Sequence, residues 1–261
     1  MKNRCRNLKS NSSGQLLLVA ALAIALLVSS TTVYVYELSK ETNADSSSPI
    51  TDFVFALKQS VFNTMIGSLA NISDGGEKTV LAANLNELSE VVRSLKQFGI
   101  TQMGFSLLND SVYDSGVRLS WNTSGVGISS VYADFTVSVH GMATNVTTNY
   151  AVNVTTTITI DGSFISLSGD EKSVNLTCRV YNEGEPALFK NVTIFYENLG
   201  SWTPVNSSNN LSIMDYGNGT YTMFFTVNAP PVVPSDSIQV SVNIYDTREI
   251  LVQANTTCYE S

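Results

Sequence analysis

The chain holds few of the side chains that carry out chemistry in proteins, and their spacing matches no catalytic pattern. His140 is the only histidine, so a Ser-His-Asp triad could use no other, and a site with several histidine ligands is excluded. It stands where a predicted strand ends, which favours a solvated loop residue. No nucleophile elbow, phosphate loop, dinucleotide-binding or EF-hand pattern is present. We expect no catalytic residue, no metal site and no cofactor, so the protein is predicted not to be an enzyme.

The cysteines suggest a bridge rather than a reactive thiol. Cys5 precedes an apolar segment, and Cys178 and Cys258 follow it at a distance. Two cysteines that share an oxidising compartment most simply pair, so we predict a disulfide between Cys178 and Cys258. Closing a loop of about 80 residues would stabilise the fold by roughly 4 kcal/mol in the chain-entropy account.

Acceptor sequences for N-linked sugars are more frequent than chance predicts. Twelve Asn-x-Ser/Thr sequences occur, against roughly five expected from the composition. Strands rich in threonine and turns rich in asparagine also raise this count. Where such an asparagine lies in a predicted strand, as Asn153 and Asn175 do, the alternation places it on the polar face. The candidates beyond the apolar segment are Asn71, Asn109, Asn122, Asn145, Asn153, Asn175, Asn191, Asn206, Asn210, Asn218 and Asn255.

The segment 16–36 is uncharged and almost entirely apolar, which predicts a transmembrane helix. Its twenty-one residues would span roughly 31 Å as a helix, about the thickness of the hydrocarbon core. A removed secretory peptide is the alternative, but the only Ala-x-Ala sequence, Ala21–Ala23, lies inside the apolar stretch. We therefore expect an uncleaved signal-anchor.

Charge gives this predicted span a direction. Residues 1–36 hold four basic and no acidic residues, whereas the remainder holds ten basic and twenty-two acidic residues, in a total net charge of −8. Basic residues before a first span place the N-terminus in the cytoplasm and the rest outside the cell. We expect a cell-membrane protein with extracellular C-terminal domains. Nucleic acid is not an expected partner, because the exterior is acidic.

Beyond a basic leader (1–15), the span and a polar linker (37–50), residues 51–160 predict an α+β membrane-proximal domain. Val54, Leu57, Val61, Met65 and Leu69 have helical spacing after the cap-like pair Thr51–Asp52, and Asn71–Gly76 ends this helix. A second apolar stripe follows at Leu81, Leu85, Leu88, Val92 and Leu95. From about residue 102 the period becomes two, with strands at 117–121, 131–139 and 152–160. Two amphipathic helices over a small antiparallel sheet are expected.

Residues 161–261 predict an all-β sandwich. Strands are expected at 173–181, 190–197, 219–227, 237–245 and 250–258, separated by turn-rich loops. The turn Asp215–Tyr221, with the sequence Asp-Tyr-Gly-Asn-Gly-Thr-Tyr, resembles that of filamin-type and related immunoglobulin-like repeats. The resemblance implies an immunoglobulin-like sandwich whose closing hairpin is the pair 237–245 and 250–258.

The leader resembles that of archaeal type IV prepilins. Ser13-Gly14-Gln15-Leu16 precedes the apolar stretch, as in prepilins, which are cut after such a glycine. The resemblance implies processing between Gly14 and Gln15. The sequence departs from that pattern at Ser13, where a basic residue is usual, and at Val19, where many pilins have glutamate.

Taken together, the sequence resembles an archaeal-type single-pass surface protein. The function we expect is structural or adhesive, with an immunoglobulin-like tip that contacts envelope or membrane proteins and with no small-molecule substrate. Two alternatives stay open: a pilin-like filament subunit processed after Gly14, and the ectodomain subunit of a membrane complex.

Overall fold

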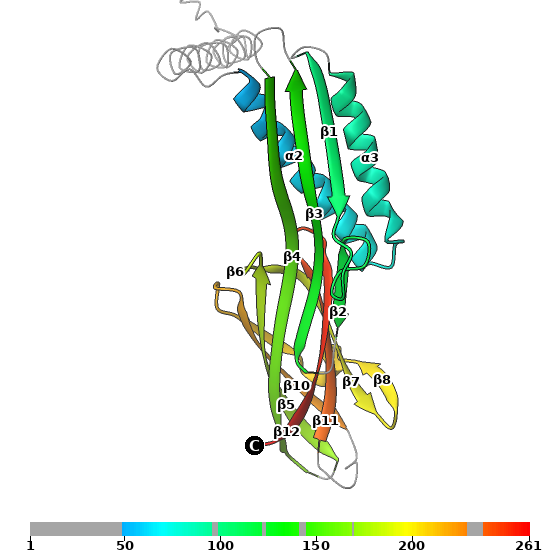
Figure 1. The fold of residues 1–261 in the computed structure, drawn as a ribbon. Helices are drawn as coiled ribbons and strands as arrows, with labels where there is room; N and C mark the ends of the chain where they lie inside the picture. The colour runs from blue at the N-terminus through cyan, green and yellow to red at the C-terminus, as the bar shows by residue number, and fades with distance from the viewer. Residues whose placement is uncertain (1–48, 96–98, 122–123, 141–144, 169, 229–236) are drawn as a thin grey trace, which may run out of the picture. The chain divides into compact units, whose positions relative to one another are not determined.

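The structure is a computed structural model that describes residues 49–95, 99–121, 124–140, 145–168, 170–228 and 237–261 (Figure 1). The chain divides into two compact units, residues 1–53 and 54–261. Only residues 49–53 of the first unit are described, and they begin a helix. The second unit contains the rest of the described chain.

Two α-helices and twelve β-strands make up the described residues, with one 3₁₀ turn, η1 (Ser207–Asn209). The elements are α2 (Pro49–Ser73), α3 (Thr79–Ser94), β1 (Ile100–Leu107), β2 (Val117–Trp121), β3 (Val126–His140), β4 (Asn145–Ser166), β5 (Glu171–Asn182), β6 (Glu185–Pro186), β7 (Phe189–Asn198), β8 (Ser201–Pro204), β9 (Ser212–Asp215), β10 (Thr220–Asn228), β11 (Ser237–Asp246) and β12 (Leu251–Glu260).

Both predicted amphipathic helices are confirmed. Along α2 the residues Leu57, Val61, Met65 and Leu69 are buried, a spacing of four that keeps them on one face. After Ser73 the chain turns at Gly75, whose φ of 103° suits glycine. On α3 the predicted Leu81, Leu85 and Val92 are buried, and Ser89 is buried beside them.

Among the described residues, no helix has the length and apolar character needed to cross a membrane. As far as the described residues go, this finding stands against the predicted N-terminal transmembrane helix, the signal-anchor and the one-span membrane location. The predicted leader, the span at 16–36, most of the linker 37–50 and the pair Gly14–Gln15 lie outside the described residues.

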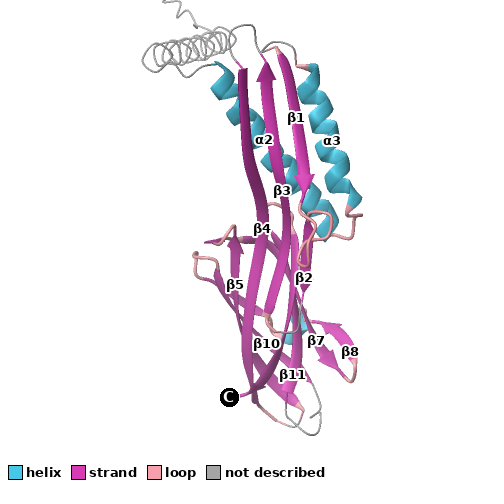
Figure 2. Ribbon diagram, viewed as in Figure 1, coloured by secondary structure: helices cyan, strands magenta, loops and turns pink. Residues whose placement is uncertain are grey.

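The strands form one twelve-stranded sheet, and β4 is the strand that joins its parts (Figure 2). β4 pairs antiparallel with β3 over residues 145–159 and with β5 over residues 156–166. Near its end it also pairs in parallel with β12. From β4 the path continues through β5 and β10 to β9 in one direction, and through β12, β11 and β7 to β8 in the other. β3 carries β1 and β2 on its far side.

Two apolar regions fill the unit. In the first, alternate residues of β3 from Val131 to Val139 are buried, and α2 and α3 lie along this part of the sheet (Figure 1). The second region lies between β4, β5 and β10 on one side and β7, β11 and β12 on the other, with Leu176 and Val242 as members. The second region includes most of the positions that alternate in the predicted strands.

The predicted fold class is therefore corrected. Instead of a separate α+β sheet and immunoglobulin-like sandwich, the described residues form two helices and one mostly-β sheet of twelve strands. The expected boundary at residues 160–161 falls inside β4, where Ile158, Ile160 and Phe164 are buried on both sides of it. The predicted closing hairpin is present as β11 and β12. Nothing in the described fold identifies it as immunoglobulin-like.

The predicted disulfide is wrong, because Cys178 and Cys258 are both free and fully buried. Each lies in the apolar region between the two halves of the sheet and acts there as a small apolar side chain. Cys178 is opposite Ile160 on β4, whereas the sulfur of Cys258 lies close to Gly162. Burial raises the pKa of each thiol to about 12.

Both buried thiols should be inert in the folded protein. With Cys5→Ser as the background, a maleimide at pH 8 should label neither cysteine in the native chain, since both are buried and protonated. Both should label at once in urea without a reductant, as counted by mass spectrometry. A chain that needs a reductant before it labels in urea would show that the cysteines are bridged after all.

Candidate interaction edge

Between Asn145 and Thr155, β4 has a strand on one side only. It pairs with β3 throughout this segment, whereas its ladder with β5 begins at Thr156. We call this segment, residues 145–155, the β4 edge. No strand of the described chain pairs with it on the side away from β3. A row of backbone donors and acceptors is therefore exposed along it.

Two amide hydrogen bonds show which backbone groups of β4 point away from β3. The amide of Ile160 donates to Gly125 on the β3 side at 2.7 Å. The amide of Thr155 instead donates to the carboxylate of Glu183 on the β5 side, at 3.0 Å. Because the direction alternates along an antiparallel strand, even-numbered residues bond to β3. The free groups belong to residues 145, 147, 149, 151 and 153.

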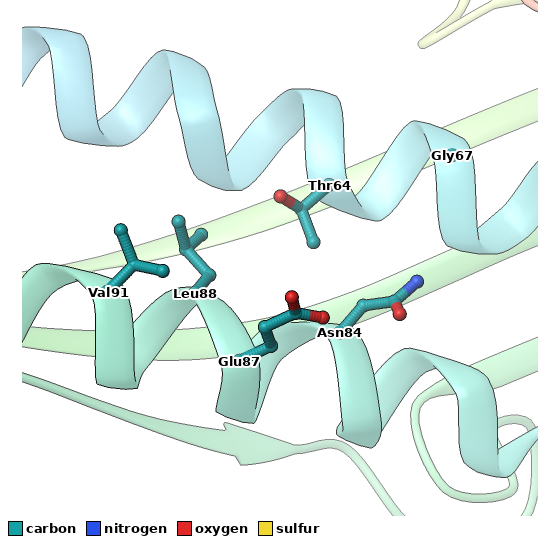
Figure 3. A pocket seen from close by; sticks show the side chains of 6 residues that line it. All are labelled: Thr64, Gly67, Asn84, Glu87, Leu88 and Val91. Atoms are coloured by element: carbon teal, nitrogen blue, oxygen red, sulfur yellow. The ribbon is translucent and has the colours of Figure 1, made fainter.

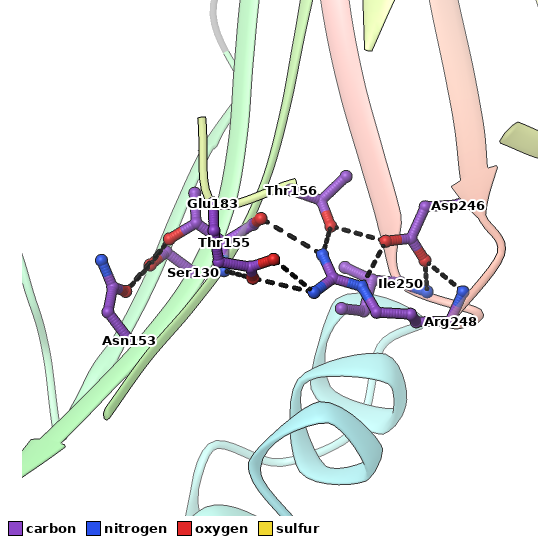
Figure 4. A network of polar contacts seen from close by, with 8 residues as sticks. All are labelled: Ser130, Asn153, Thr155, Thr156, Glu183, Asp246, Arg248 and Ile250. Atoms are coloured by element: carbon purple, nitrogen blue, oxygen red, sulfur yellow. Dashed lines mark hydrogen bonds and ion pairs between the residues drawn. The ribbon is translucent and has the colours of Figure 1, made fainter. Parts of the chain in front are cut away.

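The β4 edge ends at Thr155, where a polar network takes the place of β5 (Figure 4). Glu183, which follows the last residue of β5, donates its amide to the Thr155 carbonyl at 3.0 Å. Arg248, from the turn between β11 and β12, donates to the same carbonyl at 3.2 Å. The two side chains also form an ion pair at 2.8 Å. Glu183 and Arg248 thus satisfy the Thr155 backbone, and beyond it no described residue covers the edge in this way.

A buried carboxylate holds Arg248 in place. Asp246 is fully buried and accepts from the Arg248 Nε at 2.9 Å and from the Thr156 hydroxyl at 2.9 Å. Its other oxygen accepts from the amides of Arg248 and Ile250, at 2.8 and 3.0 Å. All of its acceptor capacity is directed to β4 and to the β11–β12 turn. The network therefore fixes Arg248 and the β11–β12 turn against β4.

Natural proteins protect strand edges, and the edges at β1, β8 and β9 have such protection. The β1 edge is partly covered by α3, since the Met103 carbonyl accepts from the Ser89 hydroxyl at 2.6 Å. β8 and β9 are four residues each, and β8 ends in proline. The β4 edge is longer and gains no such protection from the described residues. It contains no charged residue and no proline, and its ladder with β3 has no bulge.

A groove of about 360 Å³ runs between the β4 edge and α2. Its lining includes Phe55, which is 71% exposed, and Phe62 from α2. From β4 it includes Tyr150, whose ring stacks on Phe135 with centroids 5.5 Å apart. The Lys58 ammonium lies 4.7 Å from the Tyr150 ring centre. A strand added at this edge would place alternate side chains against these aromatic residues. We call this the α2 groove.

The Tyr150 hydroxyl is buried in the groove wall without a hydrogen-bond partner among the described residues. Burial raises the pKa of Tyr150 to about 12, so its hydroxyl stays neutral at physiological pH.

The face of β3 and β4 away from the helices is open and polar. Its residues on β4 are Asn145, Thr147, Asn149, Ala151 and Asn153, all exposed. Two predicted sugar acceptors, Asn145 and Asn153, therefore lie on this face. The Asn153 side chain accepts from the hydroxyls of Ser130 and Thr155, each at 3.0 Å.

The remaining predicted acceptors are scattered over the unit. Asn122 lies outside the described residues, and Asn255 is half-buried and accepts from Gln253 at 3.2 Å. The exposed ones are Asn71, Asn109, Asn175, Asn191, Asn206, Asn210 and Asn218. Exposure is compatible with modification at these positions, which stays a prediction.

A second groove, of about 380 Å³, lies between the two helices (Figure 3). Thr64 and Gly67 of α2 face Asn84, Glu87, Leu88 and Val91 of α3 across it. Near it, the Asn84 side chain donates to the Ser68 hydroxyl at 3.0 Å, which links the two helices. The described residues that line it supply one carboxylate and no histidine or cysteine. This arrangement packs the helices together and presents no constellation for catalysis.

His140 lies exposed at the end of β3, opposite Ile100 and Asn145. Neither of these neighbours carries a nucleophilic side chain. Within the described residues, no group of three or more histidine, cysteine, aspartate or glutamate side chains is placed to hold a metal ion.

Sequence reasoning missed both the β4 edge and the network that ends it. The strand 152–160 was expected, but its extension back to Asn145 was not. Alternation of Val146, Thr148, Tyr150 and Val152 was a signal that could have revealed it. The pairing of Glu183 with Arg248 joins residues 65 positions apart and has no local signal.

Comparison with known proteins adds no family. No family model matches the sequence, and no curated protein is significantly similar to it.

Breaking the network that ends the edge should destabilise the protein strongly. Asp246→Asn would leave Arg248, 16% exposed, without its buried carboxylate, and we expect the free energy of unfolding to fall by about 3 kcal/mol. Urea denaturation followed by circular dichroism would measure this.

The matched control is Glu249→Gln on the same turn, which removes an ion pair with Lys190 between two exposed side chains. It should cost at most about 1 kcal/mol. Equal losses in the two variants would contradict the central role assigned to Asp246.

Proposed function

We propose that this chain is a structural or adhesive interaction protein rather than an enzyme, and that it binds a protein partner by adding a strand at the β4 edge. The observation that carries the proposal is an eleven-residue edge with five free backbone residues and no protecting charge or proline. An added strand would satisfy these donors and acceptors with main-chain hydrogen bonds.

The α2 groove supports the proposal, because it offers the side-chain contacts that main-chain hydrogen bonds do not provide. Strand addition gives affinity through the backbone and selectivity through pockets for alternate side chains. Phe55, Phe62 and Tyr150 line a groove beside the edge, where every second residue of an added strand would lie. Phe55 is 71% exposed, and a strand added at the edge would cover it.

The chemistry of the surface defines the partner class. The β4 edge has no charge, and Lys58 is the one charged side chain among the described residues that line the α2 groove. A partner strand should therefore be extended and largely uncharged, with apolar residues on the side that faces α2. Nucleic acid fits poorly, because the chain carries a net charge of −8 and the described lining of the groove holds no cluster of basic residues.

A strand probe tests the proposal directly. The probe is a fluorescein-labelled peptide with the sequence of residues 145–155 and two lysines added for solubility, titrated with the full-length chain. Its anisotropy should rise with wild-type protein. Ala151→Pro should weaken binding about tenfold, since it deletes a free edge amide and places a ring in the path of the added strand.

Ala151→Thr is the matched control, because it keeps the amide and suits a strand. It should bind as the wild type does. The proline variant should keep the wild-type urea midpoint, since the residue 151 amide makes no bond to β3. Absence of binding by the wild type, or equal binding by the proline variant, would refute strand addition at this edge.

A further inference from the structure

We infer that the partner at the β4 edge is a second copy of this chain, joined through antiparallel pairing of the two β4 edges about a two-fold axis. This inference rests on the proposed function, since it names the strand that is added. It is carried by the parity of the free backbone groups, the uncharged sequence of the edge and the exposed Phe55 of α2.

Parity fixes the register of such a pair. The free amides and carbonyls belong to residues 145, 147, 149, 151 and 153. In an antiparallel pair, hydrogen-bonded partners must both come from this set. Only the register that sets Asn149 opposite Asn149 of the second copy uses all five, and it forms about ten main-chain hydrogen bonds.

The sequence of the edge suits pairing with itself. In this register Asn145 faces Asn153 of the second copy, and Thr147 faces Ala151, so no charged side chain meets another. On the helix side, Val146 faces Val152. Like charges placed opposite one another would oppose a dimer, and this acidic protein has none between Asn145 and Ile160.

The two-fold axis also brings Phe55 and Phe62 of the two copies together. An axis perpendicular to the sheet keeps both copies of α2 on the same side of the joined sheet. Each α2 groove then receives the helix-side residues of the second β4 and faces the second copy's Phe55 and Phe62. Phe55, 71% exposed in the single chain, would be covered by this contact.

The self-pairing of Asn149 gives a charge-reversal test on the full-length chain, followed by analytical ultracentrifugation. The wild type should form a dimer in a concentration-dependent way. Asn149→Lys alone and Asn149→Asp alone should each raise the dimer dissociation constant about fivefold, because like charges meet at the axis. An equimolar mixture of the two variants should restore dimers that contain one chain of each.

Gln102 provides the matched control. It is exposed on β1, on the same open face as Asn149 but away from the β4 edge. Gln102→Lys and Gln102→Asp, alone or mixed, should dimerise as the wild type does. Restoration by mixing also shows that the Asn149 variants are folded.

The outcomes separate this inference from the proposed function. A monomeric wild type that still binds the strand probe would overturn the dimer and leave strand addition standing. Dimers that are indifferent to charge at Asn149 would overturn the inference, since another surface would then join the copies. Larger assemblies that need the β4 edge would also overturn it, because a two-fold contact closes at two chains. A chain that neither dimerises nor binds the probe would refute both.

Discussion

The rest of the structure depends on one uninterrupted strand, because β4 keeps its pairing and its two-residue period from Asn145 to Ser166. Its first half pairs with β3 under the helices, and its second half pairs with β5 over the other apolar region. Each half of the unit uses the same strand, so neither could be removed without exposing the backbone of the other. The side chains of Glu183 and Arg248 mark the point where the pairing of β4 with β5 ends, and no described strand replaces β5 there.

Local periodicity predicted most elements but not how they join. The spacing of Leu57, Val61 and Met65 predicted α2, and the alternation around Val174 and Leu176 predicted β5. Alternation states which residues share a face, but it does not state which strand pairs with which. The sequence therefore suggested two domains where one sheet exists. A boundary placed at residue 160 cut through a strand whose buried residues continue to Phe164.

The errors at the cysteines and at the edge have one physical origin. Cys178 follows Val174 and Leu176 in the same alternation, so its place among buried apolar residues was readable, whereas its bonding state depends on geometry. The free edge likewise depends on which of the described strands lie beside β4, and the residues of β4 alone do not specify that. Glu183, Asp246 and Arg248 come from distant parts of the chain, and only the fold brings them to Thr155.

The continuity of β4 also has a mechanical consequence. The hydrogen bonds to β3 and β5 lie across the strand direction. A pull between its two ends would therefore run along one extended backbone, and the ladders on either side would hold that strand against sliding. The covalent backbone of β4 would carry tension from the helix-covered region to the other, with no linker in between. For a protein that holds two bodies together, resistance to force would then reside in this strand.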